Sequence, residues 1–300
     1  MMKIILPVMG LLLLCGICAA EPVSPGTIST AIDRSALAGE QKAALSKQAS
    51  AAIGAGIPAE DVAVIIRRGL SKNTDARALE EALGAATTAR KKGLPVRPVL
   101  DRIEQGLAKG VPPGRISAAT KQLVVKLSSA DALVDDLGRS GLKAREQREK
   151  GTAVHTVARA LEKSIPEDAI RKIGQKILAR GASLSRFAAT VDTMAFFVET
   201  GMSVAQASGL VHKAIDKGYS ENEMFMMQKE MSDMMRDKSS MNDIRKNMEI
   251  MMSSGAMGRG MGGSSSSSSN PGMGSHGMGG SGMGGMSGMG GMGGMGGHRH

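Results

Sequence analysis

Methionine and histidine recur at a regular spacing near the end of this 300-residue sequence. Five methionines and one histidine fall at every third residue of a glycine-rich stretch, and a second histidine is the last residue. Thioether and imidazole groups are soft ligands that suit Cu(I), and a glycine-rich chain could wrap several of them around one ion. The spacing predicts a copper(I) site formed by Met283, Met286, Met289, Met292, Met295, His298 and His300. The alternative is that such repeats arise by sequence slippage and hold no metal.

A second group of methionines lies upstream of this stretch. Ten of the 24 methionines fall between residues 224 and 252, and several recur every seven residues. This period predicts an amphipathic helix over 219–252, interrupted near Ser239-Ser240. Because unbranched thioether side chains repack around varied ligands, one hypothesis is a partner-binding surface made of Met224, Met227, Met231, Met234, Met241 and Met248. The other is a helix that packs against the preceding helices and caps them.

Groupings of residues that could catalyse a reaction are missing from the sequence pattern. His155 and His212 fall on separate predicted helices, and neither has a nucleophile at a suitable spacing. The adjacent carboxylates Asp135 and Asp136 cannot converge on one bond, because neighbouring helix positions face different directions. No glycine-rich loop follows a strand, as a phosphate-binding loop would. The sequence therefore predicts a protein that is not an enzyme and has no cofactor besides the Cu(I) considered above.

The chain between residues 28 and 252 is rich in good helix formers. A short triplet recurs in it: a glycine, an apolar residue, and then a serine or proline. Glycine tolerates the left-handed conformation that ends a helix, and serine or proline suits the start of the next one. Each triplet therefore predicts a tight corner between two helices. These corners are Gly56-Ile57-Pro58, Gly93-Leu94-Pro95, Gly110-Val111-Pro112, Ser164-Ile165-Pro166, Gly181-Ala182-Ser183, Gly201-Met202-Ser203 and Gly218-Tyr219-Ser220, with Asn73-Thr74-Asp75 as a variant.

The spacing of the corners is itself periodic. Within the two runs 56–110 and 164–218, successive corners are 17 or 20 residues apart (164 to 181, then 181 to 201), so two steps make 37 residues. A repeat of this length is typical of stacked helical hairpins, which bury their apolar faces only against one another. We therefore expect an all-α fold of tandem helical hairpins over 28–252, either α-solenoid-like or an irregular helical bundle. The charged stretch 128–151 breaks the rhythm and predicts an irregular repeat or a hinge.

Residues 1–20 have the layout of a secretory signal peptide: a lysine, an apolar run, and then small residues. The expected cleavage site lies between Ala20 and Glu21. An uncleaved membrane anchor and a lipoprotein signal are the alternatives, although the apolar run is shorter than a spanning helix and contains Pro7. Both cysteines, Cys15 and Cys18, would be removed, so the mature chain would have no disulfide. The prediction is an exported protein, periplasmic or extracellular, that is not an integral membrane protein after cleavage.

Residues 253–300 are almost entirely glycine, methionine and serine, with the refrain "GMGGMSGMGGMGGMGG". Glycine at this density loses much backbone entropy on ordering, and little here can offset that loss by burial. The stretch resembles the Gly-Met tail of the large bacterial chaperonin. That resemblance covers none of the chain expected to fold and implies flexibility alone. We predict a disordered C-terminal tail.

The balance of charge and aromatic residues restricts the partners. The chain carries a formal net charge of +10, but aromatic residues are only 2% of it. Base stacking is therefore poorly supplied, and we expect no nucleic acid partner. The positive charge either keeps the protein soluble or attracts anionic envelope polymers. The resulting hypothesis is a non-enzymatic binding or scaffold module of the cell envelope, whose partner is a protein or another envelope component; the alternative function is copper binding by the tail.

Overall fold

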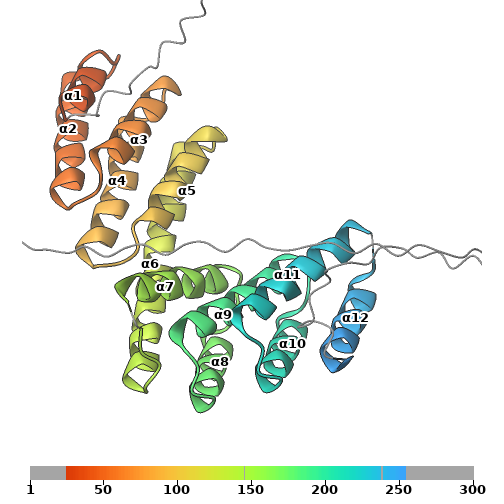
Figure 1. Cartoon of the computed structure of the whole chain (residues 1–300). Helices are drawn as coiled ribbons and strands as arrows, with labels where there is room; N and C mark the ends of the chain where they lie inside the picture. Colours follow the sequence, from red (N-terminus) through yellow and green to blue (C-terminus); the bar gives the residue numbers. More distant parts are fainter. Residues whose placement is uncertain (1–24, 145, 238, 255–300) are drawn as a thin grey trace, which may run out of the picture. The chain divides into compact units, whose positions relative to one another are not determined.

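The computed structural model describes residues 25–144, 146–237 and 239–254, and all of its regular elements there are α-helices (Figure 1). This confirms the all-α prediction for the described part of the chain. The expected signal peptide lies outside the described residues, as does the expected tail apart from two serines. The helices are α1 (Pro25–Asp33), α2 (Gly39–Gly54), α3 (Ala59–Ser71), α4 (Ala76–Lys91), α5 (Arg97–Ala108), α6 (Pro113–Arg139), α7 (Gln147–Glu162), α8 (Glu167–Ala179), α9 (Leu184–Glu199), α10 (Val204–Asp216), α11 (Glu221–Arg236) and α12 (Met241–Ser254).

The predicted corners between helices are confirmed. Every corner begins with a residue of positive φ, and two of these residues are not glycine: Asn73 at 50° and Ser164 at 60°. The hydrogen bonds at Gly56 are typical of the others. The Gly56 amide donates to the Ile53 carbonyl (2.8 Å), and the Ile57 amide donates to the Ala52 carbonyl (3.1 Å). This pairing satisfies carbonyls that the end of a helix would otherwise leave unbonded.

The residue that ends a corner caps the next helix, except at Pro95, where the following residue, Val96, is the N-cap. Ser203 is a clear case, because its hydroxyl accepts the Gln206 amide (3.3 Å) while the Gln206 side chain accepts the Ser203 amide (3.1 Å). This reciprocal capping box was predicted from the sequence. The prolines lie one position earlier than expected: Pro58 and Pro112 are the N-cap residues rather than the first helical residues. The N-cap suits proline equally well, because that residue needs only its carbonyl for the helix.

Contacts between the helices arrange them in two layers, and each helix packs mainly against its neighbours along the array. The first layer consists of α2, α4, the N-terminal part of α6, α7, α9 and α11. The second layer consists of α1, α3, α5, the C-terminal part of α6, α8, α10 and α12. First-layer helices start 37 residues apart, as in Ala76 to Pro113 and Leu184 to Glu221. This serial contact pattern is typical of stacked helical repeats.

Ion pairs between neighbouring repeats follow the same register. Lys163 reaches Glu199 (2.7 Å) in the first layer, and Lys213 reaches Glu249 (2.9 Å) in the second. In both pairs the partners are 36 residues apart. Since the pairs are largely exposed, each adds little to the free energy of unfolding. Their value is to favour one alignment of the stacked helices.

The irregular stretch predicted at 128–151 has a simple cause. The third repeat lacks its internal corner, so its two helices run on as the single helix α6 of 27 residues. The next first-layer helix then starts after 34 residues, from Pro113 to Gln147, instead of 37. The C-terminal part of α6 packs on α8, where Leu137 fills the space beside Gly174. This stretch is therefore mostly helical.

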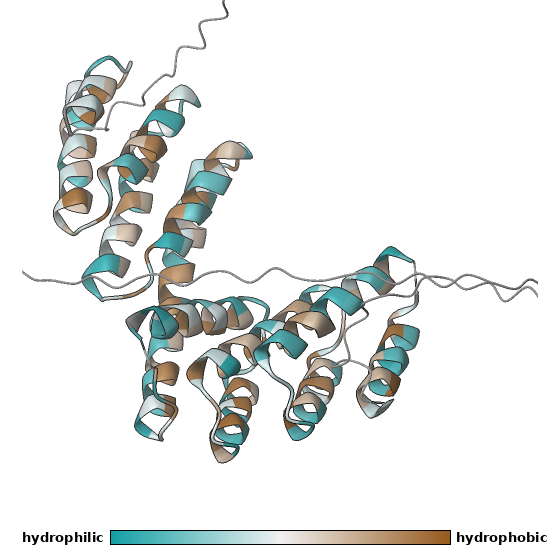
Figure 2. Cartoon of the chain, viewed as in Figure 1, coloured by the Kyte–Doolittle hydropathy of each residue, from teal (hydrophilic) through white to brown (hydrophobic). Residues whose placement is uncertain are grey.

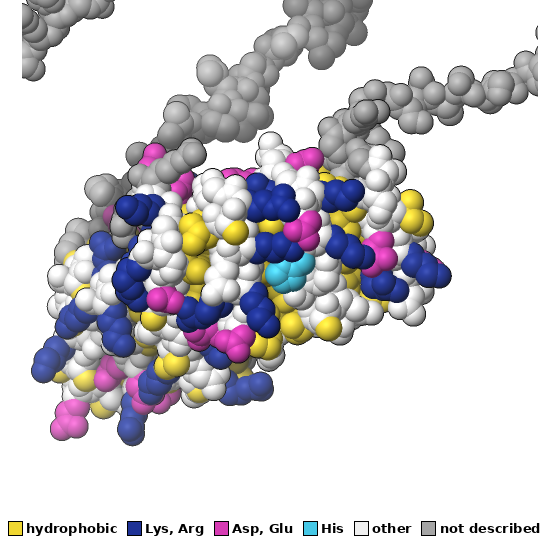
Figure 3. Space-filling model, turned by 90° about the horizontal axis from the view of Figure 1, so that it is seen from below, with side chains coloured by type: hydrophobic (Ala, Val, Ile, Leu, Met, Phe, Trp, Pro, Cys, Tyr) yellow, Lys and Arg dark blue, Asp and Glu magenta, His cyan; other side chains and the backbone are white. Residues whose placement is uncertain are grey.

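One continuous apolar core runs through the described helices, from Ile28 in α1 to Met252 in α12. Figure 2 shows the apolar residues on the sides where helices meet. On the face seen in Figure 3, basic side chains are spread over the surface and acidic ones are scattered among them. In the part of the chain that the structure describes, no helix combines the length and apolarity needed to cross a bilayer.

Candidate functional site

A groove of about 500 Å³ lies on the first layer, between α7 and α9, and the start of α11 borders it. Its middle is made of small side chains, Thr152 and Thr156 on α7 and Ala188 and Ala189 on α9. Small residues leave the space between two packed helices unfilled, whereas a leucine would close it. The groove is therefore a direct result of the residue types at these positions.

Carboxylates surround this hollow. Glu146 and Glu149 lie at the start of α7, Asp192 in the middle of α9, and Glu221 at the first residue of α11. Among the described residues that line the groove there are four carboxylates and one cation, Arg148, and Arg159 pairs with one of these carboxylates, Asp192. The whole chain has a net charge of +10. The groove is thus a negative site on a basic protein.

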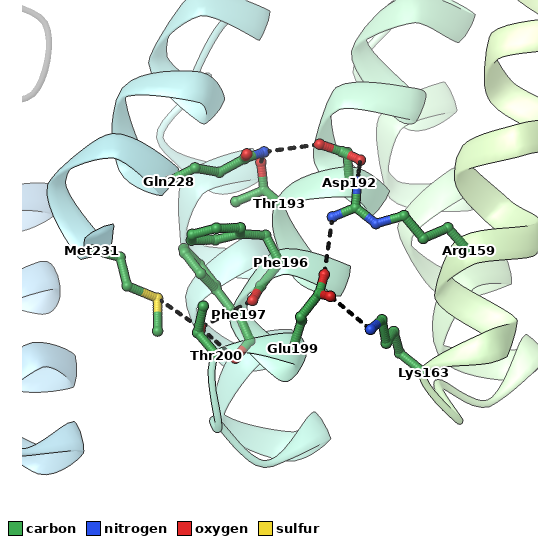
Figure 4. A network of polar contacts seen from close by, with 10 residues as sticks. All are labelled: Arg159, Lys163, Asp192, Thr193, Phe196, Phe197, Glu199, Thr200, Gln228 and Met231. Atoms are coloured by element: carbon green, nitrogen blue, oxygen red, sulfur yellow. Dashed lines mark hydrogen bonds and ion pairs between the residues drawn. The ribbon is translucent and has the colours of Figure 1, made fainter. Parts of the chain in front are cut away.

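A network of ion pairs fixes α9 against α7 beside the groove (Figure 4). The Arg159 guanidinium lies 2.9 Å from Asp192 and 3.6 Å from Glu199, and the Lys163 ammonium donates to Glu199 at 2.7 Å. The hydrogen bond from Lys163 lowers the pKa of Glu199. Arg159 bridges Asp192 and Glu199, which are about two helical turns apart on α9. It therefore sets the position of α9 along α7.

The same network continues to α11 through Gln228. Its amide nitrogen donates to Asp192 (3.2 Å) and to the Thr193 hydroxyl (3.0 Å), both on α9. The Thr200 hydroxyl, further along α9, donates to the sulfur of Met231 at 3.4 Å. Asp192 therefore receives donors from α7 and from α11, and three successive first-layer helices share one set of polar contacts.

Phe225 lies on α11, whose first residue, Glu221, lines the groove. The Phe225 side chain is 65% exposed, although aromatic residues are scarce in this chain. Glu221, which lines the groove, precedes it by four residues, and Gln228, which bonds to Asp192, follows by three. Residues at these spacings share one helix face, so Phe225 lies on the side of α11 that faces the groove. An exposed aromatic ring beside a groove is typical of binding surfaces.

A second cavity, of about 570 Å³, lies on the other side of Arg159. Three cations and two carboxylates among its described lining residues are engaged in ion pairs. Arg102 contacts both oxygens of Glu162 (3.1 and 3.0 Å), and Arg159 and Lys163 are occupied by the network described above. Because its charged side chains are already paired with one another, this cavity is a weaker candidate for ligand binding than the groove.

The methionines predicted as a partner-binding surface are mostly inside the protein. The expected 219–252 helix is two helices, α11 and α12, and Ser240 caps the second by accepting the Asp243 amide at 3.2 Å. Met234 and Met241 are partly buried against the core. Full burial is found at Met224, Met227, Met231 and Met248. This burial agrees with the alternative that the methionine-rich helices pack against the preceding helices. A partner could reach these four methionines only if α11 and α12 moved away from the helices they pack against.

The residues predicted to bind copper all lie outside the described residues. Within the described ranges, no group of three or more histidine, cysteine, aspartate or glutamate side chains is arranged to hold a metal ion. His155 lies on α7 and His212 on α10, in different layers. Loss of hydration is the main cause that lowers the pKa of each.

The groove was missed from the sequence because its parts come from three repeats. Thr152 and Ala189 are 37 residues apart and so occupy one repeat position. Both are small, which an alignment of the repeats would reveal. The exposed Phe225 occupies the same repeat position as Ala188, because the two residues are 37 positions apart. Reading the repeats beneath one another would have brought these residues together.

Comparison with known proteins identifies no relative of this chain. No family model matches the chain, and no curated protein or solved structure shows significant similarity to it. What can be said of its function therefore comes from the groove between α7, α9 and α11 and from the sequence itself.

Proposed function

We propose that this protein is an exported, non-enzymatic binding module of the cell envelope, and that its groove holds an extended segment of a partner protein. The observation that carries the proposal is the open groove on α7 and α9, and the exposed Phe225, which follows the lining residue Glu221 by one turn of α11, adds to it. The polar network around Asp192 supports it, because a binding surface fixed in advance loses less conformational entropy when it binds. Export is proposed from residues 1–20 of the sequence.

The side chains in the groove favour binding over catalysis. None of the described residues that line it is a histidine. Ser185 donates to Glu221 at 2.5 Å, but Ser183 shares the same carboxylate oxygen. A carboxylate held in this way is a weak base for activating a hydroxyl. We therefore assign Ser185 and Glu221 to the shape and charge of the groove.

Filling the groove is the direct test of the proposal. Thr152 is exposed, and its hydroxyl bonds only to the carbonyl one turn back, at Arg148. Thr152→Trp should therefore block the groove and leave the core intact. We expect affinity capture from envelope extracts to lose its bound protein in this variant.

Thr88→Trp is the matched control. Thr88 is also an exposed first-layer threonine, on α4, and it bonds to the Gly84 carbonyl in the same way. This variant should capture the same protein as the unmodified chain. Equal capture by all three proteins, each with an unchanged unfolding temperature, would show that the groove is not the binding surface.

Copper binding by the tail is the second candidate function, and it stands on the spacing of Met283 to Met295 and of the two last histidines. A competition titration against a Cu(I) chelator, with the full chain and a chain ending at Ser254, tests it. We expect the full chain alone to take up Cu(I). Equal uptake by both chains would remove this function from the tail.

A further inference from the structure

We propose that the segment held in the groove is cationic, presenting arginine or lysine side chains to the carboxylates of α7, α9 and α11. This inference rests on the proposed function and names the chemistry of its partner. It is carried by two independent features, the charge of the groove and the exposed aromatic ring on α11.

The charge of the groove is the first feature. Four carboxylates and one guanidinium are among the described residues that line it, and these carboxylates come from three different helices. Asp192 is already paired with Arg159 (2.9 Å). Glu149 has a partner of its own, and Glu221 accepts hydrogen bonds from Ser185 and Ser183 but keeps its charge. The inference therefore rests on Glu146 at the start of α7 and Glu221 at the start of α11. A cationic side chain close to carboxylates of this kind gains charge-assisted hydrogen bonds.

The exposed ring of Phe225 is the second feature. An aromatic face attracts a guanidinium or ammonium group placed over it, and arginine makes such contacts most often. Phe225 lies one helical turn after Glu221 on the same face of α11. The ring can therefore contact the aliphatic stem or the charged group of a side chain that the carboxylate binds. Neither an acidic nor a wholly apolar segment would use both groups.

The small residues of the groove indicate an extended segment. The space of about 500 Å³ lies between two helices whose facing side chains are threonine, serine and alanine. This volume suits a few side chains rather than a packed helix, which is about 10 Å wide. The Thr152 and Ser185 hydroxyls along it already donate to the Arg148 carbonyl and to Glu221, so their oxygens can still accept hydrogen bonds from the amides of a peptide backbone.

Selection from a phage-displayed library of random linear peptides tests the inference with the full-length protein. The Thr152→Trp variant serves for counter-selection, so that only peptides bound at the groove are kept. We expect these peptides to be enriched in arginine and lysine. Groove-dependent peptides without that enrichment would overturn the cationic inference and leave the proposed function standing. If no peptide depends on the groove, the inference and the proposed function both fail.

Affinity measurements on a selected peptide complete the test. Glu146→Gln and Glu221→Gln together should weaken its binding by about tenfold or more, and Phe225→Ala should weaken it several-fold. Raising the salt concentration should weaken binding to the unmodified protein. Glu40→Gln and Glu60→Gln are the controls, because both residues are exposed acids in the first turns of α2 and α3, far along the chain. An equal loss in the control pair, or no loss in the groove pair, would contradict the inference.

Discussion

Ser164 holds a backbone conformation that side chains rarely adopt. Its φ is 60°, and it begins the corner between α7 and α8. The left-handed region costs about 1–2 kcal/mol for a residue with a Cβ, and glycine loses part of that advantage through its freer unfolded chain. We therefore expect Ser164→Gly to raise the free energy of unfolding by about 0.5–1 kcal/mol, measured by urea denaturation.

Gly110 provides the reverse substitution as a control. It begins an equivalent corner before a proline, with φ at 65°, and a Cβ there would meet no atom within 4 Å. Gly110→Ser should therefore lower the free energy of unfolding through backbone strain alone. If both substitutions raise, or both lower, the free energy of unfolding, the left-handed backbone is not what distinguishes glycine from serine at these corners.

Glu81 gives the fold a dependence on acid. The Lys121 ammonium donates to it at 2.6 Å and the Ser117 hydroxyl at 2.7 Å, and these bonds lower its pKa from 4.5 to about 2. A carboxyl group whose pKa is lower in the folded chain stabilises the fold above pH 4.5, and that contribution disappears as the pH falls toward 2. We expect the unfolding temperature of Glu81→Gln to decline less over this range than that of the unmodified protein. Equal declines in the unfolding temperatures of the two proteins would contradict the assignment of this acid dependence to Glu81.

Two helix glycines allow adjacent helices to pack closely. Gly69 and Gly106 are 37 residues apart, and a Cβ on them would lie 2.5 Å from Leu79 and 2.8 Å from Ile116. Both of those side chains are buried and cannot easily move aside. Overpacking costs about 1–3 kcal/mol, which exceeds the gain of about 1 kcal/mol in helix propensity. We expect Gly69→Ala and Gly106→Ala to destabilise the protein in thermal unfolding.

Gly209 distinguishes packing from helix propensity. It lies inside α10, is exposed, and a Cβ there would meet no atom within 4 Å. Gly209→Ala should therefore stabilise the protein by up to about 1 kcal/mol. If all three substitutions changed stability in the same direction, the close contacts of α3 with α4 and of α5 with α6 would not be the cause.

The methionines of α11 test whether the last repeat is core or surface. Met227 is fully buried, whereas Met235 on the same helix is 39% exposed. Truncating a buried methionine costs about 2–5 kcal/mol, so Met227→Ser should speed amide hydrogen exchange throughout α11 and α12. Met235→Ser should leave exchange nearly unchanged. Equal exchange in the two variants would revive the hypothesis of a methionine surface.

At the scale of elements, the sequence predicted what depends on local chemistry. The corners followed from glycine, serine and proline at fixed positions, because left-handed conformations and caps are set within a few residues. The break in the rhythm at 128–151 could be seen in the sequence, but its cause, the continuous helix α6, could not, since the loss of one corner leaves no positive signal. The seven-residue methionine period predicted an amphipathic helix, but the period alone could not show whether its apolar side faces the core or a partner.

At the scale of the whole molecule, the groove depends on distances that no local pattern contains. Asp192 contacts Arg159 and Gln228, which are 33 and 36 residues away. The stacking of repeats brings these residues together and leaves the small side chains of α7 and α9 facing each other. The fold was thus largely predictable from the sequence, whereas the candidate site needed the register between repeats.

Site-specific photo-crosslinking in the intact cell envelope tests the central claim most directly. A photoreactive phenylalanine analogue replaces Phe225, and in a second protein it replaces Val125, which is equally exposed (65% and 64%) but lies on α6. We predict a protein adduct at position 225 that disappears when Thr152→Trp is added, and none at position 125. Adducts at both positions, or an adduct at 225 that persists with the groove filled, would contradict the claim that this groove holds the partner.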